Sequence, residues 1–367
     1  MRNSQLTILI VALLIASLGI ISIYSSTYQK EGKPWEDIYK RQILWVIIGL
    51  VCFMFISNLH YRRIWDWTYL LYALGLFFLF LVFALGLVRM GAQRWLKIAW
   101  FNFQPSEFLK LIIVIFLARY FSSKSVSDIS ILSGKFGITR GIIIPFIFVA
   151  IPAMMIIEQP DLGSGMIIIL LFLSLLYLTG VKLRYIVIFF ILALLPLPFL
   201  WHLLHDYQKQ RLLVFLNPNI DPLGAGYTVI QSKIAIGSGW FFGKGWLSGT
   251  QSQLHFLPES HTDFIFATFA EEWGFLGCVV LVSLYFTIIY KGFSIAQKTN
   301  DFFGKLLAFG ISLMLAIQVF VNIAMNMGLA PVVGVPLPLM SYGGSSVLCT
   351  FIALGILVNI DKTRAVF

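Results

Sequence analysis

Apolar runs of nearly membrane-spanning length recur along this chain, and they constrain its fold more than any other feature. A transmembrane helix needs about 20 consecutive, predominantly apolar residues. We expect a helix at each of the following runs: 6–25, 42–57, 67–88, 105–121, 141–157, 163–179, 185–201, 263–290, 306–326 and 346–360. Hydrophobic residues make up 59% of the chain and charged residues 11%, with a mean hydropathy of +0.90, which excludes an ordinary soluble domain. The sequence therefore predicts an all-α polytopic membrane protein with about ten transmembrane helices.

The distribution of lysine and arginine indicates the orientation of these helices. Short cytoplasmic loops carry an excess of these residues, and they are more frequent in the segments that would be inside if the N-terminus is cytoplasmic. We therefore expect both termini in the cytoplasm and the first run to be a retained helix, not a removed signal peptide. The net charge of +10 reflects mostly this bias and does not indicate nucleic-acid binding. Cys52, Cys278 and Cys349 all lie in predicted helices, so no disulfide framework is expected.

We expect residues 1–367 to form a single integral membrane domain with one long connection, 202–262, on the outer side between the seventh and eighth helices. Loops of this length are usually functional or disordered. In this loop the glycines of GAGY, GSGW and GKGW alternate with aromatic residues. Such a composition favours a large structured, turn-rich extracellular cap.

Two ionisable residues, Glu107 and Lys110, lie inside the fourth predicted helix. An ionisable group in a membrane span costs about 2.5 to 3.5 kcal/mol, so its presence suggests a function. Residues three apart share a helix face. The two side chains could therefore line a polar cavity, or neutralise each other while reaching the membrane surface, and the spacing leaves both interpretations open.

Asp161 follows Pro160 between two short predicted helices, near Glu158. An acidic residue at a helix N-terminus is often only a capping residue. On the pattern alone we favour capping over a catalytic or binding role.

The run PLPLMSYGGSS, residues 336–346, places Ser341, Gly343 and Ser345 before the last predicted helix. Small residues of this kind let backbone amides approach an anion, and they also permit close helix packing. The pattern alone favours packing.

The stretch HFLPESHTDFIFATFAEEWG, residues 255–274, gathers carboxylates where a polar loop enters an apolar run. His255, Glu259, His261 and Asp263 are plausible metal ligands, but no recognised ligand spacing is present. Asp263 ends the polar loop, so we expect it to be partly desolvated at the membrane edge. Desolvation raises the pKa of a carboxylate from about 3.9 towards values that suit a general base.

Two alternatives accompany this interpretation. Asp263 and Thr262 could simply cap the eighth predicted helix. Glu271 and Glu272, two turns further along, are expected to pair with lysine or arginine or to line a cavity.

Motifs along most of the chain resemble the SEDS (shape, elongation, division and sporulation) family. The motifs are GAQRWL at 91–96, FQPSEFLK at 103–110, QPDLGSG at 159–165, FLNPNIDPLGAGY at 215–227, QSKIAIGSG at 231–239, GKGW at 243–246, QSQLHFLPESHTDFIFA at 251–267, AEEWGFLG at 270–277 and PLPLMSYGGSS at 336–346. The short N-terminus and the last of these runs favour the rod-shape branch of the family over the division branch. Trp240 stands where the family more commonly has glycine.

The resemblance implies a ten-helix peptidoglycan glycosyltransferase that polymerises lipid II outside the cytoplasmic membrane. The implied partners are a class B penicillin-binding protein and the elongation machinery. By resemblance Asp263 is the catalytic residue, and Glu107, Lys110 and Asp161 line a central polar cavity. His261 and Thr262, together with Ser341, Gly343 and Ser345, complete the candidate substrate-binding residues.

The chemistry of such a reaction agrees with these residues. Glycosidases need two carboxylates because one must protonate a poor leaving group, whereas undecaprenyl pyrophosphate leaves without that help. One base and some positive charge suffice, and Arg94, Lys110, Arg211 and Lys244 are candidates for the charge. We expect inversion at the sugar. The sequence requires no cofactor, and a divalent cation, Mg²⁺ or Mn²⁺, could bridge the pyrophosphate and a carboxylate.

Two other classes of function remain open. A lipid II flippase or transporter would also use ionisable residues within a helical bundle. A scaffold that activates a class B penicillin-binding protein needs no catalytic residue.

Overall fold

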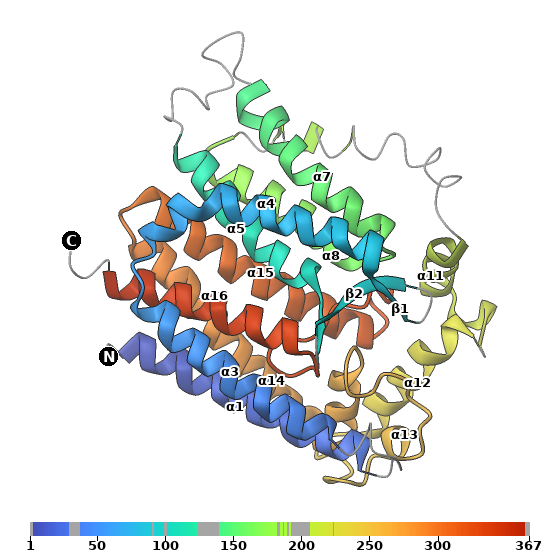
Figure 1. Cartoon of the computed structure of the whole chain (residues 1–367). Coiled ribbons are helices and arrows are strands. Elements are labelled where there is room, and N and C mark those ends of the chain that lie inside the picture. Colours follow the sequence, from blue (N-terminus) through green and yellow to red (C-terminus); the bar gives the residue numbers. More distant parts are fainter. Residues whose placement is uncertain are drawn as a thin grey trace. The chain divides into compact units, whose positions relative to one another are not determined.

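The computed structural model describes residues 3–28, 37–89, 92–98, 101–123, 139–181, 184–185, 187–188, 191, 206–222 and 224–363. Helices dominate these residues (Figure 1). They are α1 (Asn3–Thr27), α3 (Ile38–Asn58), α4 (Arg62–Leu85), α5 (Pro105–Ser122), α7 (Ile144–Glu158), α8 (Leu162–Leu178), α11 (Asp206–Leu216), α12 (Ala225–Ser238), α13 (Thr250–Gln253), α14 (Ile265–Lys298), α15 (Phe302–Asn326) and α16 (Gly344–Thr363). A π-helical turn, Thr139–Ile143, precedes α7, and a 3-10 turn, Pro218–Ile220, follows α11.

Within the described residues, seven helices are long and apolar enough to cross a membrane. They are Ser4–Thr27, Ile38–Asn58, Arg62–Leu85, Gly141–Glu158, Ile265–Lys298, Phe302–Asn326 and Gly344–Thr363. Helix α8 is apolar but has only 17 residues, and α5 carries three charged residues among its 18. The polytopic helical class predicted from the sequence is therefore confirmed. The run predicted at 185–201 lies mostly outside the described residues.

The chain forms two compact units. One comprises residues 1–51, 203–290 and 315–350, and the other comprises residues 52–202, 291–314 and 351–367.

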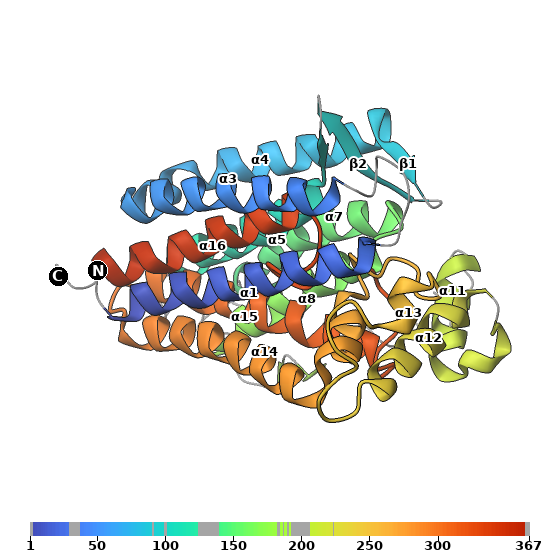
Figure 2. The same ribbon diagram turned by 90° about the horizontal axis from the view of Figure 1, so that it is seen from below.

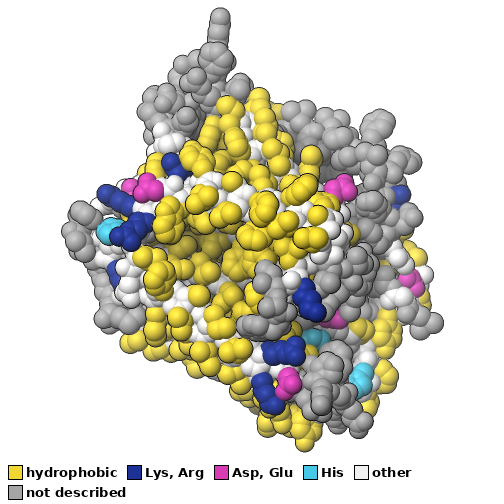
Figure 3. Space-filling model, viewed as in Figure 1, with side chains coloured by type: hydrophobic (Ala, Val, Ile, Leu, Met, Phe, Trp, Pro, Cys, Tyr) yellow, Lys and Arg dark blue, Asp and Glu magenta, His cyan; other side chains and the backbone are white. Residues whose placement is uncertain are grey.

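In the second unit, α4 packs on α5, and α8 packs on both α5 and α7. One side of α4 is buried through Tyr72, Leu79 and Val82. Its other side exposes 54% of Phe77 and 62% of Phe80, and Figure 3 shows the hydrophobic surface that such side chains form. A helix that is hydrophobic on all sides is typical of a membrane span.

The connection between α4 and α5 contains three short strands, which the sequence did not predict. Strands β1 (Leu87–Arg89), β2 (Ala92–Ile98) and β3 (Phe101–Phe103) pair antiparallel in the order β1-β2-β3. Helix α4 ends at Leu85, and Gly86 after it adopts an extended conformation. The helix therefore begins five residues before the predicted run 67–88 and ends three residues before that run does. Strand pairing satisfies backbone hydrogen-bonding groups of this connection.

In the first unit, the long connection contains α11, α12 and α13. Helix α12 packs against α11 and α13, and α13 packs against α1 (Figures 1 and 2). A hydrophobic core joins α12 to the start of α14 through Ala235, Leu257, Phe264 and Ala267, all nearly inaccessible to solvent. This core fixes the chain on both sides of Asp263.

Helix α14 is interrupted, whereas the sequence predicted one continuous run at 263–290. Gly274 has φ 64° and ψ −165°, a conformation that is essentially restricted to glycine. A Cβ atom at this position would lie 2.2 Å from the Gly243 backbone nitrogen. The segment from Phe275 to Lys298 would alone extend about 36 Å at about 1.5 Å per residue, which is enough to cross the hydrocarbon core. The segment before Gly274 is therefore a separate helix that begins just after Asp263.

The loop at 240–245 satisfies backbone groups on both sides of this interruption. The hydrogen bonds run from Phe275 N to Trp240 O (2.9 Å), Leu276 N to Phe241 O (3.1 Å), Lys244 N to Glu271 O (3.0 Å) and Gly245 N to Glu272 O (3.0 Å). Irregular backbone near a membrane is tolerated where protein groups satisfy it in this way.

Candidate active site

Asp263 lies in the turn that immediately precedes α14, and it is half-buried. Its backbone carbonyl accepts hydrogen bonds from the side-chain amides of Asn322 and Asn326, each at 3.0 Å. Both asparagines belong to α15 and are fully buried. The backbone of the candidate base is therefore held by a long helix and not by its own loop.

The two carbonyls before that of Asp263 are also held. The His261 carbonyl accepts from the Tyr342 backbone N–H at 2.9 Å, and the Thr262 carbonyl accepts from the Ser341 hydroxyl at 2.7 Å. Three consecutive carbonyls are thus bound by residues from α15 and from the segment before α16. Such multiple anchoring restricts the backbone from which the Asp263 side chain projects.

The sequence analysis missed Asn322 and Asn326. A signal was present, because both are polar residues at the end of the run predicted at 306–326 and four residues apart, which places them on one helix face. Polar residues within a membrane span commonly mark a functional region.

Ser341 and Gly343 are engaged with protein groups. The Ser341 hydroxyl also accepts from the Leu337 N–H at 2.8 Å, and the Gly343 N–H donates to Gln42 Oε1 at 3.3 Å. These contacts correspond to the packing interpretation of the run 336–346. Ser345 is buried in the first turn of α16.

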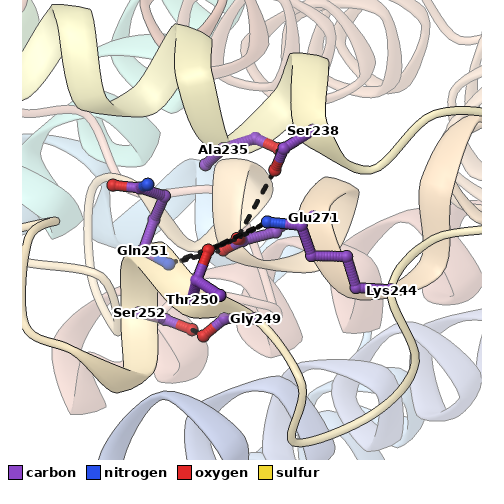
Figure 4. A network of polar contacts seen from close by, with 8 residues as sticks. All are labelled: Ala235, Ser238, Lys244, Gly249, Thr250, Gln251, Ser252 and Glu271. Atoms are coloured by element: carbon purple, nitrogen blue, oxygen red, sulfur yellow. Dashed lines mark hydrogen bonds and ion pairs between the residues drawn. The ribbon is translucent and has the colours of Figure 1, made fainter.

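Glu271 is fully buried and is the centre of a polar network (Figure 4). Its Oε1 atom lies 2.6 Å from Lys244 Nζ and accepts from the Thr250 hydroxyl at 3.0 Å and the Gln251 N–H at 3.2 Å. The expected pairing of Glu271 with a basic residue is therefore confirmed. Lys244, one of the four candidate cations, neutralises a carboxylate in the described structure.

Glu272 is likewise buried, and it accepts a hydrogen bond from the Ser25 hydroxyl of α1. The Gln253 amide donates to the Ser25 carbonyl at 2.9 Å. This cluster joins α1, α13 and the first segment of α14 within the first unit.

Arg211 in α11 donates to the Val332 carbonyl at 3.1 Å. It lines a small pocket with residues that include Val229, Gly328 and Pro331.

Two candidate substrate-binding residues, His261 and Thr262, directly precede Asp263. His261 is buried and Thr262 is half-buried, and the Thr262 hydroxyl donates to Glu259 Oε2 at 2.8 Å.

In the second unit, Glu107 and Lys110 form an ion pair of 2.7 Å in the first turns of α5. Only 3% and 1% of their side chains are exposed, so they do not reach the membrane surface by snorkelling. Removal of either charge would leave the other one buried without its ion-pair partner.

Asp161 lies beside this pair. Its Oδ1 atom accepts from the Ser164 N–H at 3.2 Å and caps α8, which confirms the capping interpretation. Its Oδ2 atom accepts from the Ser106 hydroxyl at 3.1 Å, and Ser106 directly precedes Glu107. The structure therefore brings Glu107, Lys110 and Asp161 together at the N-terminal ends of α5 and α8.

Arg94 in β2 approaches the same region. Its Nε atom donates to the Gln159 carbonyl at 3.2 Å, two residues before Asp161. Glu158, at the end of α7, is exposed, and among the described residues its side chain has no hydrogen bond or ion pair of this kind.

Within the described residues, no three His, Cys, Asp or Glu side chains are close enough to hold a metal ion. A cation that bridges a carboxylate and a substrate pyrophosphate stays a prediction.

Comparisons with known proteins agree with the motifs. The family model described as "Cell cycle protein", FTSW_RODA_SPOVE, matches residues 5–365. Peptidoglycan glycosyltransferase MrdB of Escherichia coli (strain K12) is 42% identical over 359 residues, covering 98% of this chain and 93% of the relative.

Solved structures show the same fold. A chain described under "Structural coordination of polymerization and crosslinking by a peptidoglycan synthase complex" is 29% identical with a TM-score of 0.80, covering 97% of each chain. The rod shape determining protein RodA of Thermus thermophilus is 25% identical with a TM-score of 0.70, covering 97% of this chain and 96% of the other.

Proposed function

This chain belongs to the SEDS family of peptidoglycan glycosyltransferases, and from that premise we propose that it polymerises lipid II into glycan strands during cell elongation. The reaction would take place at the outer face of the cytoplasmic membrane. About ten transmembrane helices with both termini in the cytoplasm would place the long connection 202–262 on that face.

In this proposal, Asp263 is the general base. It would remove the proton from the 4-hydroxyl of an acceptor N-acetylglucosamine, whose oxygen then attacks C1 of the donor N-acetylmuramic acid. The bond from C1 to undecaprenyl pyrophosphate breaks in the same displacement, with inversion. The observation that carries the proposal is the half-buried carboxylate at the start of α14, whose backbone is fixed by two buried asparagines. A general base must be held in position as well as desolvated.

The leaving pyrophosphate requires positive charge. Arg94, Lys110, Arg211 and Lys244 all stay candidates for this charge, and Lys110 and Lys244 each lie against a buried carboxylate. A guanidinium group also matches phosphate geometry with paired hydrogen bonds. Glu107, Lys110 and Asp161 would line the polar cavity that receives the sugar and phosphate groups.

We also propose a class B penicillin-binding protein as partner. The similar chain from a peptidoglycan synthase complex, and the 42% identity to MrdB over nearly the whole chain, support this assignment. The partner would supply the crosslinking reaction, and the present chain the polymerisation.

The test is polymerisation of purified lipid II by the wild-type protein and by Asp263→Asn, each co-purified with its partner after the transpeptidase is blocked. Asp37→Asn is the matched control, because it removes a carboxylate whose side chain is 46% exposed near the start of α3. We expect glycan chains from the wild type and Asp37→Asn, and none from folded Asp263→Asn. Equal polymerisation by all three would refute Asp263 as the base. Failure of the wild type would favour the flippase or the scaffold alternative.

A further inference from the structure

Two buried asparagines of α15 contact the peptide segment that carries Asp263. Asn322 Nδ2 donates to the Asp263 carbonyl at 3.0 Å and to the Val335 carbonyl at 2.8 Å. Asn326 Nδ2 donates to the same Asp263 carbonyl at 3.0 Å and to the Asn322 carbonyl at 2.8 Å. One carbonyl oxygen thus uses both lone pairs on two amides from one helix.

Asn326 also holds the helix that follows. Its Oδ1 atom accepts from the Ala267 N–H at 3.2 Å, in the first turn of α14. The Ala267 N–H also donates to the Phe264 carbonyl at 3.1 Å, so Asn326 shares this donor with the turn that begins the helix. A single asparagine side chain therefore binds an acceptor before the helix and a donor inside it, which a purely apolar side chain of similar size cannot do.

Burying an amide side chain costs free energy, so the hydrogen bonds of Asn322 and Asn326 indicate what these buried residues do. Both asparagines are 0% exposed, and burying an amide is favourable only when its hydrogen bonds are made. Besides their contacts with the Val335 and Asn322 carbonyls and the Ala267 N–H, both side chains donate to the Asp263 carbonyl. They fix the peptide plane at Asp263 and hence the direction in which its side chain leaves the backbone.

We infer that Asn322 and Asn326 are positioning residues that hold Asp263 in the orientation required for proton removal from the acceptor sugar. The inference rests on the proposed function of Asp263. A displacement of about 1 Å in a catalytic group can lower a rate by about 100-fold.

The experiment replaces each asparagine by leucine, which retains much of the volume but makes no hydrogen bond. Gln318→Met is the matched control. Gln318 is a buried amide one turn before Asn322 and two turns before Asn326 in α15, and the substitution replaces it by an apolar side chain of similar length. Lipid II polymerisation is measured with the partner complex, to give kcat and KM, and thermal unfolding of each complex is measured in parallel.

We expect Asn322→Leu and Asn326→Leu to lower kcat about 10- to 100-fold, with KM changed by less than about twofold. Gln318→Met should retain kcat.

Three outcomes would overturn the inference. If both leucine variants keep wild-type kcat while Asp263→Asn is inactive, the asparagines do not position the base, and the proposed function stands. If Gln318→Met loses as much activity as the two leucine variants, and the loss in each variant follows the loss of folded protein, the role of Asn322 and Asn326 is structural only. If Asp263→Asn itself polymerises normally, the proposed function fails and the inference fails with it.

Discussion

Lys244 and Glu271, 27 residues apart in the chain, form an ion pair of 2.6 Å that joins the long connection to the first segment of α14. The carboxylate is fully buried, whereas 27% of the lysine side chain is exposed. The same carboxylate accepts from Thr250 and Gln251, so one side chain holds three points of the loop. This arrangement fixes the loop against the helix that begins after Asp263.

We predict that Lys244→Met destabilises the protein by about 2 kcal/mol, less than the 3 to 5 kcal/mol of a fully buried pair, because the lysine is partly exposed. The cause is an uncompensated buried carboxylate, so adding Glu271→Gln should restore most of the loss. Thermal unfolding in detergent measures both. Lys40→Met is the control, since its pair with Asp37 is exposed and should contribute less than about 1 kcal/mol. Equal effects at the two lysines would contradict the prediction.

Gly274→Ala should prevent correct folding of α14. The new Cβ would approach the Gly243 nitrogen to 2.2 Å, and the backbone conformation at Gly274 is available only to glycine, so we expect a loss of at least about 3 kcal/mol. The yield of monodisperse protein after size-exclusion chromatography reports it.

Gly237→Ala in α12 is the control for Gly274→Ala. A Cβ atom at Gly237 would meet nothing within 4 Å. Alanine should therefore stabilise this helix by about 0.5 to 1 kcal/mol. A normal yield of Gly274→Ala would show that the interruption of α14 is not required.

Trp240→Gly should stabilise the protein by about 1 kcal/mol. Trp240 has φ 48°, which is unfavourable for a bulky residue, and 84% of its side chain is exposed. The substitution therefore relieves backbone strain and removes little packing. A rise in the midpoint of thermal unfolding would confirm this expectation.

Trp246→Gly provides the comparison for Trp240→Gly. The Trp246 ring stacks on Tyr24 with centroids 6.0 Å apart, so its removal should lower the unfolding midpoint. If Trp240→Gly lowers the midpoint equally, the exposed Trp240 indole has a stabilising contact that outweighs the strain.

Lys110→Met should destabilise the second unit by about 3 to 5 kcal/mol, because it leaves Glu107 charged and buried. The double variant Glu107→Gln with Lys110→Met should recover the stability but not the polymerase activity if these residues bind substrate. Parallel measurements of thermal unfolding and lipid II polymerisation separate the two roles. Recovery of activity together with stability would show that the pair is structural.

Much of the fold follows from local properties of the sequence. The positions of nine helices agree with apolar runs, because a membrane span must be long, apolar and internally hydrogen-bonded, and these requirements act within each segment. The strands between α4 and α5 were not predicted, since they are short and form only when a partner strand is present. The end of α4 at Leu85 was missed because the apolar run continues past Gly86, where the backbone becomes extended.

The candidate site also combines features that are visible in the sequence with features that only the tertiary structure shows. The sequence by itself singled out the candidate residues: Asp263 at the boundary of a polar loop, Glu107 and Lys110 three apart in one helix, and Asp161 at a helix start. Their proposed roles come from the resemblance to the SEDS family and not from spacing. Only the tertiary structure decided what holds them. The contacts of Asn322 and Asn326 with Asp263, of Lys244 with Glu271 and of Ser106 with Asp161 join segments far apart in the chain. Such tertiary contacts form between groups that are distant in the sequence and come together only when the helices pack, so no local sequence pattern predicts them.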